Sequence, residues 1–299
     1  MSSAAISPGW FDHLNPNDLA LLSRVAPQAG VAANDLVRDR AALTTVLAHP
    51  RAFELLFPPG EVGEVPVAPA DLLVPASPFL AFALVVHRGW ADLQSARYVA
   101  EWVGPRQRLP VLGGDDLRDF LASDKRRLFL TELLSSYTRV SSGSTWVHTT
   151  RGWRRRKFSE LDPVRLASLL EVVPEGERPG VYRRLGDLAL FLTGVFPDHT
   201  ELNGLGPMDE ARLLRMSGLP ERESNLPPAA PAGGVGILER LGEHWYRLAL
   251  RSLSGPLTGT MSVVADVAGS FVAARRTLNY LTDRHLFAGR TRWFGQEAS

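Results

Sequence analysis

Two groups of basic residues carry the clearest chemistry in this sequence. They comprise Lys125, Arg126 and Arg127, and then Arg151, Arg154, Arg155, Arg156 and Lys157. An arginine side chain stays charged at physiological pH, and its planar guanidinium donates paired hydrogen bonds to phosphate oxygens. Trp146, His148 and Trp153 accompany the second group, and aromatic rings of this kind stack on bases or sugars. The pattern is typical of a surface that contacts nucleic acid.

The positive charge is local, because the whole chain of 299 residues has a formal net charge of only +1. Residues 88–158 contain fourteen basic and seven acidic residues, so this segment is +7 and the rest of the chain is −6. Such confinement indicates one anion-binding surface, because a polycationic protein would carry its charge along the whole chain.

Short helices and strands would position these residues. From residue 91 to residue 158 we expect, in order, a helix at 91–103, a strand at 108–112, helices at 115–122 and 125–140, and strands at 145–150 and 153–158. The last two segments are rich in Thr, Val, Trp and Phe, which favour strands. Arg151-Gly152 would form the turn between them, because glycine tolerates positive φ.

This order of elements resembles that of the winged-helix family. The resemblance is one of topology only, because no signature sequence of the family is present, and it covers about a quarter of the chain. It implies that the third helix, residues 124–139, reads bases in the major groove of DNA. It also implies that the hairpin wing holds the DNA backbone or the minor groove.

Two features of the same residues favour a structural role instead. A run of four basic residues on a hairpin also protects an exposed sheet edge from aggregation. The helix at 125–140 contains Leu128, Phe129, Leu130, Leu133 and Leu134, which leaves little exposed face for a DNA groove.

The flanking segments complete a mainly α, multi-helix protein with one small hairpin. Residues 1–75 predict helices at 17–25, 34–48 and 51–57 and then an extended linker. Residues 76–160 form the winged-helix-like unit. Residues 161–299 predict a helical bundle with helices at 164–173, 182–196, 208–217, 236–253 and 258–287 and a flexible linker at 219–234. The helix at 182–196 is apolar nearly all round, which is typical of a helix buried in a core.

The last predicted helix also suggests a partner. Its small residues Ala265, Ala268, Gly269, Ala273 and Ala274 would let another helix approach closely. Beyond it, Trp293 and Phe294 would dock on the protein's own body or meet a partner. We expect docking on the body, with a homodimer through the last two helices as the alternative.

Motifs for catalysis or metal binding are absent from the sequence. The chain has no cysteine, which excludes thiolate metal sites and cysteine nucleophiles. None of the seven histidines lies in a metal-binding motif. The densest acidic and histidine groups are Asp198, His199 and Glu201, and Glu243 with His244. We therefore expect no metal, no cofactor and no enzyme activity. An enzyme or ligand-binding protein is kept as a less favoured alternative, with a pocket between the helix at 182–196 and the last two helices that uses Arg184, Asp187, His199 or His244.

The remaining expectations concern location and function. The sequence begins without a signal peptide and contains no apolar run long enough to span a membrane, so we expect a cytoplasmic protein without membrane contact. Only Lys125 and Lys157 are lysines among the 33 basic residues, a bias that suggests a bacterial source with GC-rich DNA. The function expected is non-enzymatic, regulatory DNA binding. The main alternative is a helical scaffold whose basic hairpin contacts an acidic protein.

Overall fold

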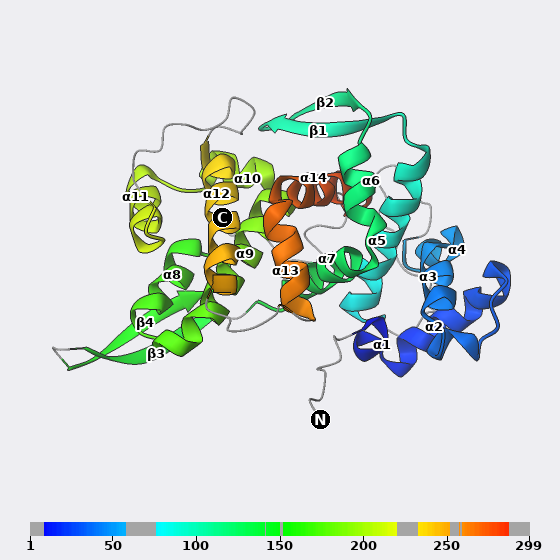
Figure 1. Cartoon of the computed structure of the whole chain (residues 1–299), viewed down its shortest axis with the longest axis horizontal. Helices are drawn as coiled ribbons and strands as arrows, with labels where there is room; N and C mark the ends of the chain where they lie inside the picture. The colour runs from blue at the N-terminus through cyan, green and yellow to red at the C-terminus, as the bar shows by residue number, and fades with distance from the viewer. Residues whose placement is uncertain are drawn as a thin grey trace. The chain divides into compact units, whose positions relative to one another are not determined.

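The computed structural model describes residues 9–57, 76–140, 142–149, 152–219, 233–251, 257 and 259–286, and the side chains of 142–149 and 152–158 lie outside the described part. The expected mainly α fold with a small hairpin is confirmed (Figure 1). The chain divides into two compact units. The first consists of Met1–Val99, Val111–Thr138 and Tyr280–Ser299, and the second of Ala100–Pro110 and Arg139–Asn279.

The first unit is built mainly from helices. They are α1 (Trp10–His13), α2 (Pro16–Val25), α3 (Arg40–Ala48), α4 (Pro50–Leu56), α5 (Pro78–Ser95), α6 (Asp115–Ala122) and α7 (Asp124–Ser136). Of these, α2, α3, α4 and α5 have a side-chain N-cap. Asn15 and Ser77 cap α2 and α5 through side-chain oxygens, each followed by proline at the first helical position. Trp10, Leu22, Leu43 and Leu80 are among the buried residues of the core. The caps thus set where α2 and α5 begin.

The helix expected at 34–48 is interrupted. A 3₁₀ turn spans Asp35–Val37, and α3 begins only at Arg40. The extended residue Asp39 separates them and caps α3, because its carboxylate accepts a hydrogen bond from the Ala41 N–H at 2.8 Å. A capping aspartate therefore outweighs the apolar periodicity that favours one long helix.

The helix expected at 91–103 is wrong. Helix α5 continues through Gly89, and strand β1 (Tyr98–Gly104) follows it. Gly89 is a site of close approach, because a Cβ atom there would lie 2.1 Å from Cδ2 of Leu281. Tyr98 and Val99, at the start of β1, are residue types that favour strands.

The second unit contains the helices that follow the basic hairpin. They are α8 (Pro163–Ala167), α9 (Arg178–Val195), α10 (Pro197–Asn203), α11 (Pro207–Met216), α12 (Gly233–Arg251), α13 (Thr260–Gly269) and most of α14 (Phe271–Leu281). The helix expected at 164–173 is shorter, because 3₁₀ turns at Ser168–Glu171 and Glu175–Glu177 follow α8. Helix α10 forms where a loop was expected. Proline begins α8, α10 and α11, where it costs no hydrogen bond.

Helix α9 is buried, as its apolar sequence predicts. Leu185, Leu188, Leu190 and Phe191 are at most 1% exposed. The backbone of α9 comes close to α12 at Gly186, where a Cβ atom would lie 2.5 Å from Cδ1 of Tyr246. The α9–α12 pair is therefore a main packing contact of the second unit.

The single C-terminal helix expected at 258–287 is instead three segments. Helix α13 ends at Gly269, α14 begins at Phe271, and a π-helical turn spans Thr282–Leu286. Ser270 leaves the helical conformation with φ −130° and ψ 34°, and its hydroxyl donates to the Asp266 carbonyl at 2.7 Å. In α14, Arg275 donates to Glu239 of α12 at 2.5 Å and to Asn279 at 2.9 Å, so α14 is tied to α12 by a buried ion pair.

The described residues contain two small sheets, one more than expected. Strands β1 and β2 (Gln107–Leu112) form one, and β3 (Ser142–Thr149) and β4 (Gly152–Ser159) form the other. The β3–β4 hairpin confirms the expected strand pair, with slightly longer strands. Among the described residues, no helix is both long enough and apolar enough to cross a membrane.

Candidate nucleic-acid interface

The β3–β4 hairpin aligns the basic run with the aromatic residues. Ser144 pairs with Lys157, Trp146 with Arg155, and His148 with Trp153 in an antiparallel register. Paired positions share one face of a ribbon, and successive positions alternate between faces. These six positions therefore belong to one face. They combine two tryptophans, a histidine and two basic residues, while Arg154 and Arg156 occupy positions of the opposite face.

The described residues after β4 fix the base of this hairpin. Glu160 follows the strand directly and forms an ion pair with Arg184 of α9 at 3.4 Å. Asp162 then caps α8, accepting from the Val164 and Arg165 N–H groups at 3.0 and 3.1 Å. In the second unit, the hairpin extends from α8 as a ribbon (Figure 1). Arg151 lies outside the described residues, as do the side chains of Arg154, Arg155, Arg156 and Lys157.

The three basic residues at the start of α7 have different surroundings. Lys125 is exposed. Arg126 is partly exposed, and its guanidinium lies 5.3 Å from the ring centre of Phe120. Arg127 is only 4% exposed and donates to the Leu121 carbonyl at 2.5 Å, the Ala122 carbonyl at 3.1 Å and the Asp124 carboxylate at 3.1 Å. Only Lys125 and Arg126 therefore reach solvent.

Arg127 is a core residue, which corrects its assignment to the DNA surface. Its guanidinium lies 4.2 Å from the ring centre of Trp90, a cation–π contact. Burial, together with the nearby cation of Arg40, lowers the pKa of Arg127 to about 10, so it remains charged at neutral pH. Its two terminal nitrogens donate inside the protein, and its Nε, which has no hydrogen-bond partner, is buried away from any phosphate.

The burial of α7 also weighs against the groove-reading role expected of residues 124–139. Leu128, Phe129, Leu130, Leu133 and Leu134 are buried, as is Thr131. A recognition helix needs one continuous exposed face to enter the major groove. Helix α7 belongs to the first compact unit and the β3–β4 hairpin to the second. The winged-helix-like unit at 76–160 stays a prediction, and the hairpin is the part of it that best fits nucleic-acid contact.

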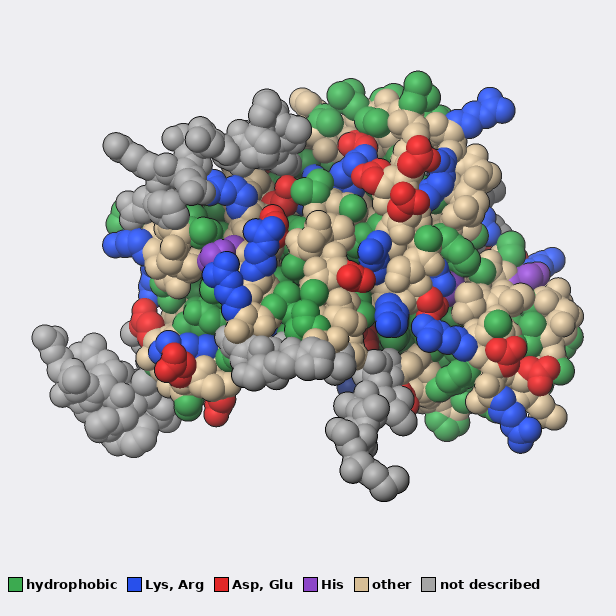
Figure 2. Space-filling view, in the orientation of Figure 1, with side chains coloured by type: hydrophobic (Ala, Val, Ile, Leu, Met, Phe, Trp, Pro, Cys, Tyr) green, Lys and Arg blue, Asp and Glu red, His purple; other side chains and the backbone are tan. Residues whose placement is uncertain are grey.

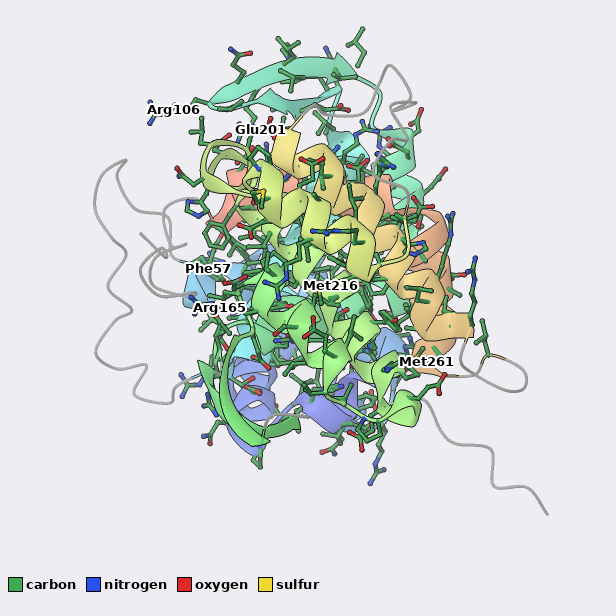
Figure 3. All side chains as sticks on the ribbon, turned by 90° about the vertical axis from the view of Figure 1, so that its left-hand side faces the viewer. Phe57, Arg106, Arg165, Glu201, Met216 and Met261 are labelled. Carbon is green, nitrogen blue, oxygen red and sulfur yellow. The ribbon has the colours of Figure 1, made fainter. Side chains whose placement is uncertain are left out.

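Asp198, which the sequence groups with His199 and Glu201, anchors the β1–β2 sheet. Its carboxylate accepts from the Trp102 indole at 2.7 Å, the Arg106 N–H at 3.0 Å and the Arg108 guanidinium at 3.2 Å. Burial alone would raise the pKa of Asp198, but these donors together lower it below its usual value. Arg106, labelled in Figure 3, has a positive φ of 59°. Asp198 therefore holds the strained turn between β1 and β2.

The other acidic and histidine candidates also have structural partners. Glu201, labelled in Figure 3, accepts from the Val235 N–H at 3.1 Å near the start of α12. His244 Nε2 donates to the Ser217 carbonyl at 2.9 Å. In the described part of the chain, no three His, Asp or Glu side chains gather as a group of possible metal ligands.

Asp187 is the most buried of the residues considered for a ligand pocket. Its carboxylate accepts from the Tyr246 hydroxyl at 2.8 Å and lies 4.0 Å from Nε of Arg183. Burial raises the pKa of Asp187, although Arg183, the Tyr246 hydroxyl and Arg184 act in the opposite direction. The contact joins α9 to α12, so it supports the helix pair.

Two polar clusters of the first unit could not be found from the sequence. Asp92 meets Arg88 at 3.1 Å, Arg284 at 3.0 Å and His285 at 3.6 Å. Asp124 accepts from the Trp10 indole at 3.1 Å and contacts Arg40 as well as Arg127. Arg88 and Arg127 stand at helical spacing from these carboxylates, but the other partners are so far apart along the chain that they leave no periodic signal in the sequence.

No protein-family model, curated protein or solved structure matches this chain.

Proposed function

We propose that this protein is a non-enzymatic nucleic-acid-binding protein whose contact element is the β3–β4 hairpin. The observation that carries the proposal is the backbone register. It assigns Trp146, His148, Trp153, Arg155 and Lys157 to one face of a two-stranded ribbon. A ribbon of this kind can enter a DNA groove or follow a single strand, with aromatic rings on bases and cations on phosphates.

The division of charge between the compact units also supports the proposal. The second unit, which carries the hairpin, contains 20 Lys and Arg residues against 16 Asp and Glu residues. The first contains 13 against 16. A polyanion is therefore attracted to the second unit and repelled by the first. Regulation of transcription is the role that we infer for such binding in a bacterial cytoplasm.

Removing the arginines of the hairpin tests the proposal. Binding of a labelled DNA duplex would be measured against salt concentration for wild type and for R154A/R155A/R156A. Each lost phosphate contact should reduce the slope of log affinity against log salt by about 0.9. The triple variant should therefore lose a slope of about 1 where only Arg155 of the contact face meets phosphate, and up to about 3 where Arg154 and Arg156 of the opposite face do so as well. The matched control is R24A/R38A/R51A, which removes three exposed arginines of the first unit. Equal slopes in the two variants would refute the proposal.

A second candidate function is protein–protein interaction, and the β1–β2 sheet favours it. Half of the exposed large apolar side chains among the described residues belong to these two strands. They are Tyr98, Val103, Leu109, Val111 and Leu112, with exposures of 38–84%. Exposed apolar side chains concentrated in this way are typical of a contact surface.

Light scattering would test self-association, with L109S/L112S compared against wild type. A wild-type mass of one chain at high concentration excludes a homodimer. A dimer that persists in L109S/L112S would favour the alternative interface, which is formed by the C-terminal helices. There, Ala268 is 4% exposed and Ala274 is 0% exposed, so both are already covered within the chain. Trp293 and Phe294 lie outside the described residues.

A further inference from the structure

Helix α12 presents a row of basic residues that the sequence analysis does not single out. Arg240, His244, Arg247 and Arg251 follow one another at intervals of four, three and four residues. At 3.6 residues per turn these intervals keep all four on one side of the helix. Arg240 and His244 are partly exposed, while Arg247 and Arg251 are exposed. Figure 2 shows Lys and Arg side chains gathered over α12. We call these four residues the α12 basic row.

The opposite side of α12 is fully used by the core. Val235, Leu238, Leu241, Trp245 and Ala249 are at most 1% exposed. A basic amphipathic helix binds a membrane by inserting its apolar face among the lipids. Helix α12 has no apolar face left for that purpose, so the α12 basic row can attract a partner only through its charges.

Neighbouring contacts hold the row in place. His244 donates to the Ser217 carbonyl, and the Trp245 indole donates to the Ser217 hydroxyl, each at 2.9 Å. These bonds fix the end of α11 against the middle of α12, and the two helices lie side by side in Figures 1 and 3. Arg247 also contacts Glu243 at its flank. Among the described residues, Arg251 has no carboxylate partner.

The length of the α12 basic row indicates which kind of anion it can bind. Arg251 lies eleven helical steps after Arg240, a distance along the helix axis of about 16 Å. Charges spread over that distance cannot converge on one small phosphate group. They suit a polymer with a negative charge at every step, such as one strand of a nucleic acid, which rises about 3.4 Å per phosphate. We propose that the α12 basic row is a second, sequence-independent contact surface for the nucleic-acid backbone. This inference rests on the proposed function.

The test uses the full chain and neutralises two residues of the row. Duplex binding would be measured against salt for wild type, R247Q/R251Q and the charge-matched control R24Q/R38Q in the first unit. R247Q/R251Q should reduce the slope of log affinity against log salt by about 2 relative to the control. R247K/R251K keeps the charges and should restore the slope. Circular dichroism would verify that the substitutions leave the helix content unchanged, because cations also stabilise a helix C-terminus.

The outcomes separate this inference from the proposed function. Wild-type binding that R154A/R155A/R156A weakens, with equal slopes for R247Q/R251Q and its control, overturns the inference alone. No salt-dependent binding by wild type overturns both. Binding to anionic vesicles or to an acidic protein that needs Arg247 and Arg251, without binding to duplex or single-stranded DNA, likewise overturns both and assigns the row to that partner.

Discussion

His87 is a buried histidine whose environment permits only the neutral form. It is 0% exposed, its ring centre lies 5.1 Å from that of Trp10 and 6.2 Å from that of Trp90, and neither ring nitrogen has a hydrogen-bond partner. Burial, with a further contribution from Arg127, lowers the pKa of His87 to about 3. Protonation is therefore coupled to unfolding.

The first prediction concerns His87→Leu. A histidine whose pKa is lower in the folded than in the unfolded protein stabilises the fold fully above pH 6.5 and less as pH falls toward about 3. Wild type should therefore lose about 2 kcal/mol of unfolding free energy between about pH 7 and about pH 4.5 that H87L retains. Urea unfolding at the two pH values measures this. His199→Leu is the control, because His199 is partly exposed. Parallel losses in wild type and H87L would disprove the coupling.

Asp187 titrates with the opposite sign. Its pKa is raised in the folded protein, chiefly by burial. The folded protein therefore holds this proton more tightly than the unfolded chain does. The contribution of Asp187 to stability is fully present below the ordinary pKa of 3.8 and is lost as pH rises through the folded value.

The second prediction is that Asp187→Asn removes this loss. Asparagine can still accept from the Tyr246 hydroxyl but carries no charge to bury. The unfolding free energy of D187N minus that of wild type should increase as pH rises from below 3.8 and then become constant. Chemical unfolding across this range measures the difference. Asp35→Asn, at an exposed position, is the control. A difference that does not change with pH would contradict the assignment.

At the scale of elements, glycine marks where two segments touch. Gly89 of α5 lies against Leu281, and Gly186 of α9 lies against Tyr246. Glycine lowers the stability of a helix, but because it has no side chain it lets a neighbouring segment pack closely against the helix. The sequence alone suggests a break at Gly89, because the partner that explains the glycine lies nearly two hundred residues later.

The third prediction is a coupling between Gly89 and Leu281. Gly89→Ala forces its new methyl group into the Leu281 side chain and should cost about 1 to 3 kcal/mol of unfolding free energy. Leu281→Ala should cost about 2 to 5 kcal/mol, because Leu281 is 0% exposed. In G89A/L281A the clash is gone, so the double variant should be more stable than the sum of the single costs implies. Strict additivity in chemical unfolding would show that the two residues do not touch.

Local signals in the sequence predict where several helices begin. Asn15-Pro16, Ser77-Pro78 and Asp162-Pro163 begin α2, α5 and α8 as their residue types require. The β3–β4 pair follows from its strand-forming residues. The break at Ser270 depends on a serine bonding to its own preceding turn. A serine side chain that bonds to the backbone in this way offers an alternative to the helical hydrogen bond. The pattern of apolar residues gives no sign of it, so the break could not be predicted.

The candidate site was predictable only in part, for the same reason. Lys125, Arg126 and Arg127 are equivalent in sequence, yet only Arg127 is enclosed by Trp90 and the carbonyls that precede α7. The α12 basic row follows helical spacing and could have been found by counting along residues 240–251. Its recognition as a surface needs the burial of the opposite face, which only the packing of α12 against α9 provides.

At the scale of the whole molecule, chain order and compact units do not coincide. The first unit takes the N-terminal helices together with Tyr280–Ser299, while the second lies between them in sequence. Within the first unit, Asp92 of α5 forms an ion pair with Arg284 of the π-helical turn and lies 3.6 Å from His285. Leu286 is also buried, at 1% exposed. The first unit is therefore complete only when residues 280–286 have joined the helices that precede residue 139.

The fourth prediction is that a chain ending at Leu281 loses stability in one unit only. The truncation removes Arg284, His285 and Leu286 and leaves Asp92 with only Arg88 of its three partners. Amide hydrogen exchange should accelerate in α5 and remain slow in α9, which belongs to the second unit. Helix α9 is the internal control, because a general loss of folding would accelerate both segments. Equal acceleration in α5 and α9 would show that the two units unfold as one. Unchanged exchange in α5 would show that the contacts of the π-helical turn do not stabilise the first unit.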